Sequence, residues 1–124
     1  MFWKWKKAIT FEKWLDNILK NFNLDAVAFN FNIYENDNGY STELVATSSF
    51  DKSNDDWACD EIYASRNDGN EFQFNADDWE TALALVQNNI SNYLDNGAYS
   101  VKLKKANAVA CGFTDGNLTL IFLK

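Results

Sequence analysis

The sequence predicts a single α+β domain over residues 1–124, in which two helices pack on a mostly antiparallel sheet of about six to seven strands. Two patterns of apolar residues support this fold class. Apolar residues recur at helical spacing over residues 10–22 and again over residues 77–96. Elsewhere they alternate in short segments separated by turn residues, as in half-buried strands. The predicted order is helix, four strands, helix, three strands.

The N-terminal helix is predicted over residues 10–22, with Thr10 as its N-cap. Its apolar stripe consists of Phe11, Trp14, Leu15, Ile18, Leu19 and Phe22. Spacings of three and four residues place these side chains on one face of a helix, so we expect this face to pack on the sheet.

The second helix is predicted over residues 77–96. Asp77 and Glu80 stand three residues apart, as in an N-terminal capping arrangement, and their negative charge suits the first turn of a helix. Gly97 is able to end the helix by taking a positive φ. The apolar stripe of this helix consists of Trp79, Leu83, Val86, Ile90, Tyr93 and Leu94.

Four strands are predicted between the two helices. The first lies in residues 27–34, where every odd position is apolar. Asn38-Gly39 predicts a hairpin turn after it, because both residues tolerate positive φ. The other three strands are predicted at residues 42–50, 58–65 and 71–74.

Three further strands are predicted after the second helix. Residues 99–104 indicate a weaker strand, whereas residues 108–113 and 118–123 indicate a hairpin across Thr114-Asp115-Gly116-Asn117. Hairpin connections favour antiparallel pairing, and this is why the sheet is predicted to be mostly antiparallel.

The chain contains no histidine. This excludes Ser-His-Asp and Cys-His nucleophile systems, histidine-based ribonuclease chemistry and histidine metal sites. No motif among the remaining residues specifies a reaction. We therefore expect a non-catalytic protein with no metal and no other cofactor.

The formal net charge of −7 is distributed unevenly along the chain. Residues 25–100 carry fifteen acidic residues against Lys52 and Arg66, a net charge of −13, whereas the segments before and after them carry +3 each. A nucleic-acid binder needs a working surface of the opposite sign, so we expect no nucleic acid as a partner. Such an acidic surface steers a basic protein toward itself, which favours a basic protein partner.

The densest acidic segment is Asp51-Lys52-Ser53-Asn54-Asp55-Asp56-Trp57-Ala58-Cys59-Asp60-Glu61. An EF-hand loop starting at Asp51 would need Gly at position 56 and Glu at position 62, where Asp56 and Ile62 stand instead. Three alternatives to a protein-binding surface stay open. They are a small carboxylate- or metal-dependent hydrolase that uses this cluster, an acidic nucleic-acid mimic that regulates a DNA- or RNA-binding protein, and a solvated loop.

Cys59 and Cys111 belong to no CxxC pair and are predicted to be reduced packing residues of a cytoplasmic protein. No window approaches the ~18 apolar residues of a membrane span. The segment Phe2-Trp3-Lys4-Trp5-Lys6-Lys7 has the composition of a membrane-surface contact. We favour packing of Trp5 and Ile9 on the domain and no membrane contact, because anionic lipid repels an acidic protein.

Residues 43–51, 55–63 and 110–118, which read ELVATSSFD, DDWACDEIY and ACGFTDGNL, resemble the small bacterial immunity proteins encoded beside polymorphic toxins, including those of contact-dependent growth inhibition. The resemblance covers most of the chain from about residue 25. It implies a non-catalytic protein that neutralises a cognate toxin domain encoded by the neighbouring gene. Many toxins of these systems are nucleases with basic clefts, so the implied partner agrees with the charge distribution.

The predicted toxin-binding residues combine acidic contacts with aromatic anchors: Asp51, Asp55, Asp56, Trp57, Asp60, Glu61, Tyr63, Asp68 and Glu71. Buried aromatic side chains commonly anchor protein interfaces, and this is the role predicted for Trp57 and Tyr63. If strand alternation holds through residues 58–63, some of these side chains face the core instead.

Overall fold

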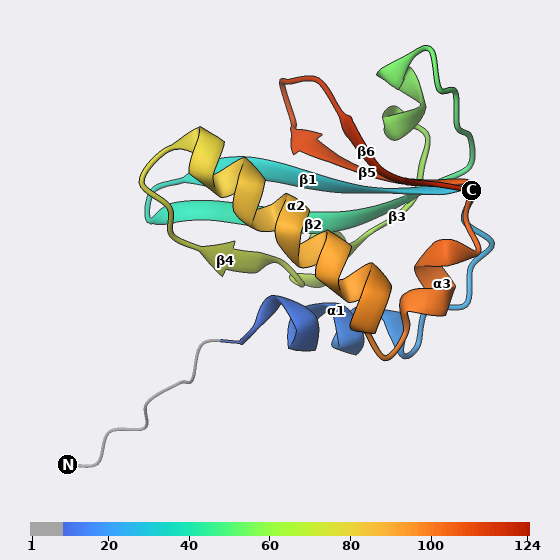
Figure 1. The fold of residues 1–124 in the computed structure, drawn as a ribbon, viewed down its shortest axis with the longest axis horizontal. Helices are drawn as coiled ribbons and strands as arrows, with labels where there is room; N and C mark the ends of the chain where they lie inside the picture. Colours follow the sequence, from blue (N-terminus) through green and yellow to red (C-terminus); the bar gives the residue numbers. More distant parts are fainter. Residues whose placement is uncertain (1–8) are drawn as a thin grey trace.

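The computed structural model describes residues 9–124, which form three α-helices, two 3-10 helices and six strands. The helices are α1 (Phe11–Leu19), α2 (Trp79–Asn96) and α3 (Ser100–Lys104), and the 3-10 helices are η1 (Asp55–Cys59) and η2 (Ser65–Asp68). The strands are β1 (Ala28–Asn36), β2 (Gly39–Thr47), β3 (Glu61–Ala64), β4 (Phe72–Phe74), β5 (Ala108–Phe113) and β6 (Thr119–Leu123). Figure 1 shows α2 crossing the sheet.

The six strands belong to one sheet, ordered β3-β2-β1-β5-β6, and β4 pairs with β2 beyond the end of β3. Every pair is antiparallel except β1 and β5, which run parallel. A parallel pair needs a long connection, and here that connection contains α2 and α3. The predicted α+β class with a mostly antiparallel sheet is confirmed.

One face of the sheet, which we call the covered face, packs on the helices. Its central side chains are Phe29, Phe31 and Ile33 of β1, all buried, and they belong to one core cluster with residues of α1 and α2. Phe31 lies 5.9 Å from Phe11 and 6.3 Å from Trp14 of α1, measured between ring centroids. The apolar stripes of the helices therefore bury the odd-numbered residues of β1, as the alternation predicts.

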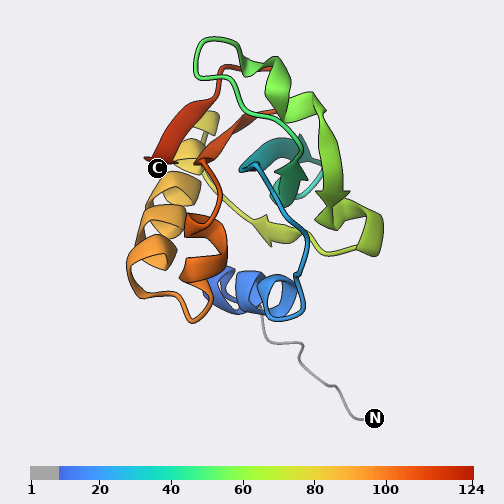
Figure 2. The ribbon, with the colours of Figure 1, turned by 90° about the vertical axis from the view of Figure 1, so that its right-hand side faces the viewer.

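The opposite face, which we call the open face, carries the even-numbered residues of β1. No helix covers it. Its end near Ala28 packs against Trp57, together with Ala108 and Ala110 of β5. Trp57 comes from the segment 48–60, which carries η1 and lies at the top of Figure 2, away from α1, α2 and α3. This segment shields only part of the open face.

Both predicted helices are present, with shifted ends. Thr10 caps α1 as predicted, accepting a hydrogen bond from the Lys13 amide at 3.1 Å, but α1 ends at Leu19. Asp78, and not Asp77, caps α2, because its side chain accepts a hydrogen bond from the Thr81 amide at 2.8 Å. Gly97 follows α2 with a φ of −69°, so its predicted positive φ is wrong.

The predicted strand at residues 99–104 is wrong, because Ser100–Lys104 form α3. Apolar residues alternate in this segment as they would in a strand, but they do not share one buried face. The side chain of Leu103 packs into the core, while that of Val101 is exposed. The strand predicted at residues 58–65 begins only at Glu61. The residues before it turn into η1, because the Asn54 side chain accepts a hydrogen bond from the Asp56 amide at 2.9 Å.

The hairpin predicted at Asn38-Gly39 joins β1 to β2. Gly39 has a φ of 143°, and a Cβ there would lie 2.6 Å from the carbonyl oxygen of Phe74, so only glycine fits this turn. In the described part of the chain no helix is long and apolar enough to cross a membrane. The prediction for residues 2–7 lies outside the described residues, and Ile9, predicted to pack, is 42% exposed.

Candidate binding site on the open face of the sheet

A row of hydrogen-bonded polar side chains crosses the open face. Asn30 donates to Asn32 across 2.7 Å, and Asn32 donates to Glu43 of β2 across 3.3 Å. Asn30 is fully buried, and the side chain of Glu43 is only 4% exposed. A sheet face that served only for packing would carry apolar residues at these positions, since burying polar groups costs free energy.

Arg66 of η2 holds the acidic end of this row. Its guanidinium donates to both carboxylate oxygens of Glu43, at 2.9 and 3.0 Å, and to Glu61 of β3 at 2.7 Å. These hydrogen bonds, that to Glu61 first, raise the pKa of Arg66 above its ordinary value. The buried carboxylate of Glu43 is thereby compensated, because a hydrogen-bonded guanidinium is the strongest partner a carboxylate finds in a protein.

The acidic segment 51–61 is held in place by its own side chains. Asp51 accepts from the Ser53 amide at 2.8 Å, and Asp60 accepts from the Ser49 hydroxyl at 2.5 Å. Asp55 accepts from the backbone amide of Leu118 at 3.1 Å, which ties η1 to the turn between β5 and β6. Figure 2 shows this segment beside the β5–β6 hairpin. The exposed carboxylates are thus presented by an ordered loop.

A cavity of about 280 Å³ opens between η1, the β5–β6 turn and the open face. Asn30 and Asn32 line it from the sheet, Asp55 and Cys59 from η1, and Glu61 from β3. The turn reaches this position because β5 has Gly112 here, where a Cβ would lie 2.6 Å from the carbonyl oxygen of Asn117. Acidic and amide side chains dominate the charged and polar part of the lining, and it contains no lysine or arginine.

The predicted toxin-binding residues do not form one surface. Asp55 and Glu61 line the cavity on the open face, whereas Asp51, Asp56 and Asp60 line a shallower hollow of about 260 Å³ on the outer side of the same loop. These five carboxylates are exposed and belong to one segment.

The remaining predicted contacts lie elsewhere. Tyr63 and Asp68 line a cavity of about 390 Å³ beside α1, where the Tyr63 ring packs edge-on against Phe22 at 5.4 Å. Burial and the nearby Asp68 raise the pKa of Tyr63. Glu71 is half-buried, and its Oε2 has no hydrogen-bond partner within residues 9–124.

Trp57 is only 4% exposed and packs edge-on against Phe50 at 5.2 Å. Its indole anchors the acidic loop to the sheet, because it fills the space over the alanines of β1 and β5. So little of this side chain is left for a partner that we remove Trp57 from the proposed contact residues.

Four residues of the open-face row were not predicted: Asn30, Asn32, Glu43 and Arg66. The alternation of β1 placed the two asparagines on a solvent-facing side. Arg66 was considered only as one of the two bases in residues 25–100. The signal that was available is the Asn-x-Asn spacing itself, which puts two amides on the same side of one strand.

Trp79 was predicted to belong to the buried stripe of α2, but it is 56% exposed. Its ring lies edge-on to Phe113 with 6.3 Å between centroids. Three exposed acids surround it in the sequence, Asp77, Asp78 and Glu80. The hydrogen bond from the Thr81 amide lowers the pKa of Asp78, so this carboxylate serves the end of the helix.

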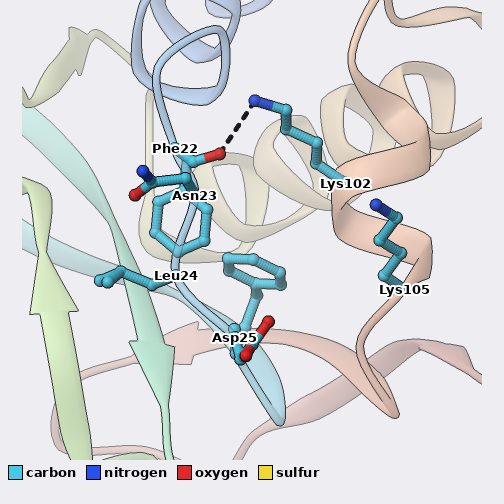
Figure 3. A pocket seen from close by; sticks show the side chains of 8 residues that line it. Phe22, Asn23, Leu24, Asp25, Lys102 and Lys105 are labelled. Atoms are coloured by element: carbon cyan, nitrogen blue, oxygen red, sulfur yellow. Dashed lines mark hydrogen bonds between the residues drawn. The ribbon is translucent and has the colours of Figure 1, made fainter.

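A further cavity of about 220 Å³ lies between α3 and the segment that follows α1 (Figure 3). Lys102 extends across it, and its ammonium donates to the carbonyl oxygens of Leu19 and Phe22 at 2.6 and 2.9 Å. The Leu19 carbonyl ends α1 and the Phe22 carbonyl belongs to the segment after it, so the charge of Lys102 stabilises the end of this helix and the turn that follows. Lys105 is the other base that lines the cavity.

The residues 9–124 include no group of three His, Cys, Asp or Glu side chains arranged to hold a metal ion. The predicted packing role is wrong for Cys59, which is exposed, whereas Cys111 is buried as predicted. Comparisons with protein-family models, curated proteins and solved structures found no match to this chain.

Proposed function

We propose that this chain is an immunity protein, which binds a basic toxin domain and neutralises it without catalysis. The observation that carries the proposal is the ordered acidic loop: four exposed carboxylates within residues 51–60, opposed in that segment by Lys52 alone. Hydrogen bonds already fix Asp51, Asp55 and Asp60. The loop then loses little conformational entropy on binding, which favours tight association.

The partner that fits this loop is a protein whose basic cleft grips phosphate, such as a nuclease domain. Carboxylates occupy such a cleft in place of phosphates, or bind beside it and block access. An interface of standard size buries about 1,600 Å² in total, and charge pairs within it support dissociation constants in the nanomolar range. The resemblance to immunity proteins points to the product of the neighbouring gene as this partner.

The proposal is tested by co-expressing the chain with the toxin domain encoded beside it. We expect growth to be restored, and a one-to-one complex to form whose dissociation constant rises at least about tenfold between 50 and 300 mM salt. Absence of both protection and a complex would contradict the proposal. A complex whose dissociation constant does not depend on salt would be consistent with the immunity role but would contradict its electrostatic basis.

A pair of triple variants separates the loop from the overall charge. The first replaces Asp51, Asp56 and Asp60 with asparagine. The matched control replaces Asp25, Glu35 and Asp95 with their amides, which changes the net charge by the same amount at exposed positions outside the loop. We expect the loop variant to weaken binding by at least about thirtyfold and the control by less than about threefold. Equal losses would show that only net charge matters.

A further inference from the structure

We infer that the cavity on the open face receives a cationic side chain, lysine or arginine, from the partner. This inference rests on the proposed function, and it names the chemistry by which one part of the partner is recognised. It concerns the cavity between η1 and the β5–β6 turn and is separate from the outer side of the acidic loop.

The first observation is an unpaired acceptor at the cavity. The amide nitrogen of Asn30 donates to Asn32, but Oδ1 of Asn30 has no hydrogen-bond partner among the described residues. Asn30 is fully buried and lines the cavity from the sheet. Buried acceptors are nearly always paired in proteins, so this oxygen is suited to a donor supplied by a bound group.

The second observation is the charge around that acceptor. Asp55 and Glu61 line the cavity, while Glu43 lies one hydrogen bond behind Asn32. Arg66 compensates only part of this charge, since it is one base between two carboxylates and does not line the cavity. The three carboxylates and the one guanidinium together carry a formal charge of −2, which favours a cation over a neutral hydrogen-bond donor.

The third observation is size. The cavity of about 280 Å³ is slightly smaller than the roughly 300–1,000 Å³ typical of small-molecule sites. One long side chain with a charged end fits this volume. Its methylene groups would contact Ala58 and Leu118 of the lining, and its nitrogens would reach the amide and carboxylate oxygens.

Two adjacent residues of η1 supply a matched pair of variants. Asp55 lines the cavity, whereas Asp56 lines the hollow on the outer side of the loop. Asp55→Asn and Asp56→Asn make the same change of charge, and an asparagine at position 55 still accepts the hydrogen bond from Leu118. We expect Asp55→Asn to raise the dissociation constant of the toxin complex at least about tenfold, and Asp56→Asn only about threefold, its share of the loss expected of the triple loop variant. Equal effects would overturn the cavity assignment and leave the proposed function intact.

Asn30→Leu tests the buried acceptor. Leucine removes an unpaired buried polar atom, and the half-buried Asn32, which loses its hydrogen bond from Asn30, can pair with water instead. We therefore expect the free protein to keep or raise its Tm while the dissociation constant rises at least about tenfold. Unchanged affinity in a folded Asn30→Leu variant would overturn the inference. If this variant unfolds, the inference is tested by comparing the dissociation constants of Asp55→Asn and Asp56→Asn.

A titration of the chain alone, without the toxin, tests the cavity separately from the proposed function. The full chain is titrated with methylguanidinium, and with urea as a neutral compound of similar shape, while the side-chain amide resonances of Asn30 and Asn32 are followed by NMR. Shifts from methylguanidinium alone support the inference even if the neighbouring toxin fails to bind. Equal shifts from both compounds, or none from either, overturn it.

Discussion

The two faces of the sheet bury residues of β1 by different means. On the covered face, Phe29, Phe31 and Ile33 contact an aromatic and aliphatic core, and their burial is itself the stabilising term. On the open face, Asn30 and Asn32 are withdrawn from solvent among hydrogen bonds, and one acceptor is left unpaired. Burial on the covered face serves folding. On the open face, burying the unpaired acceptor of Asn30 costs stability.

The same contrast separates the two cysteines, and it predicts the largest effect. Cys111 lies on the covered face, where burial raises the pKa of its thiol to about 12 from 9.0, while Cys59 is exposed at the cavity. At pH 8 the thiolate of Cys111 is about 1,000-fold rarer than that of a thiol with the ordinary pKa. Labelling with a disulfide reagent is therefore expected to lose its fast phase in Cys59→Ser and to keep it in Cys111→Ser. Similar rates for both thiols would contradict the contrast.

A truncation on the covered face is expected to be next in size. Phe31 is fully buried between Phe11 and Trp14. Phe31→Ala removes its apolar contacts and leaves a cavity, so the free energy of unfolding should fall by about 3–4 kcal/mol in urea denaturation. On the open face the neighbouring Asn32→Ala is the comparison, with an expected loss of about 1–2 kcal/mol, because the buried Asn30 amide loses its acceptor. A loss of equal size at both positions would remove the distinction between the faces.

The ion pair of the open face is expected to contribute less. Arg66→Ala leaves the buried Glu43 carboxylate without its partner, which costs about 3–5 kcal/mol for a fully buried pair. Because the Arg66 side chain is 42% exposed, water replaces part of the interaction, and we expect about 2 kcal/mol in urea unfolding. Adding Glu43→Gln should recover about half of this loss. If the double variant were less stable than Arg66→Ala, the unpaired charge of Glu43 would not be the source of the loss.

A polar contact beneath the covered face is predicted to give the smallest effect. Tyr93 of α2 is buried and donates to Asp16 of α1 at 2.6 Å; burial first, and then this hydrogen bond, raise its pKa. Tyr93→Phe should cost about 1 kcal/mol at pH 8. A raised folded pKa stabilises the protein below the unfolded pKa of about 10, and that contribution is lost as the pH rises above it.

The pH dependence supplies the check on Tyr93. The wild-type free energy of unfolding should decline from pH 10 to pH 11.5, and Tyr93→Phe should show a shallower decline. Some slope should remain in the variant, because burial also raises the pKa values of Tyr40 and Tyr63. An unchanged slope would show that Tyr93 keeps the same pKa in both states.

The sequence by itself was sufficient for the α+β class, both long helices and the hairpin at Gly39. These features depend on contacts between near neighbours: the spacing of apolar residues in α1, the hydroxyl of Thr10 at its first turn, and the positive φ of Gly39. It also placed residues 51–57 correctly between two strands, although it began the second of these strands at residue 58, three residues before β3 starts. The charge of that segment is a property of composition, which folding does not change.

The tertiary structure alone decided which of these residues meet. Period-two alternation assigned Asn30 and Asn32 to the outer side of a strand, but the η1 segment and the β5–β6 turn, distant in sequence, fold over that side. The same long-range packing buried Trp57 and left Trp79 exposed. A period-two pattern indicates only that the two faces of a strand differ in polarity. Whether the polar face meets solvent, a loop or a partner depends on segments far along the chain, and this is why the candidate cavity was not predictable from the sequence.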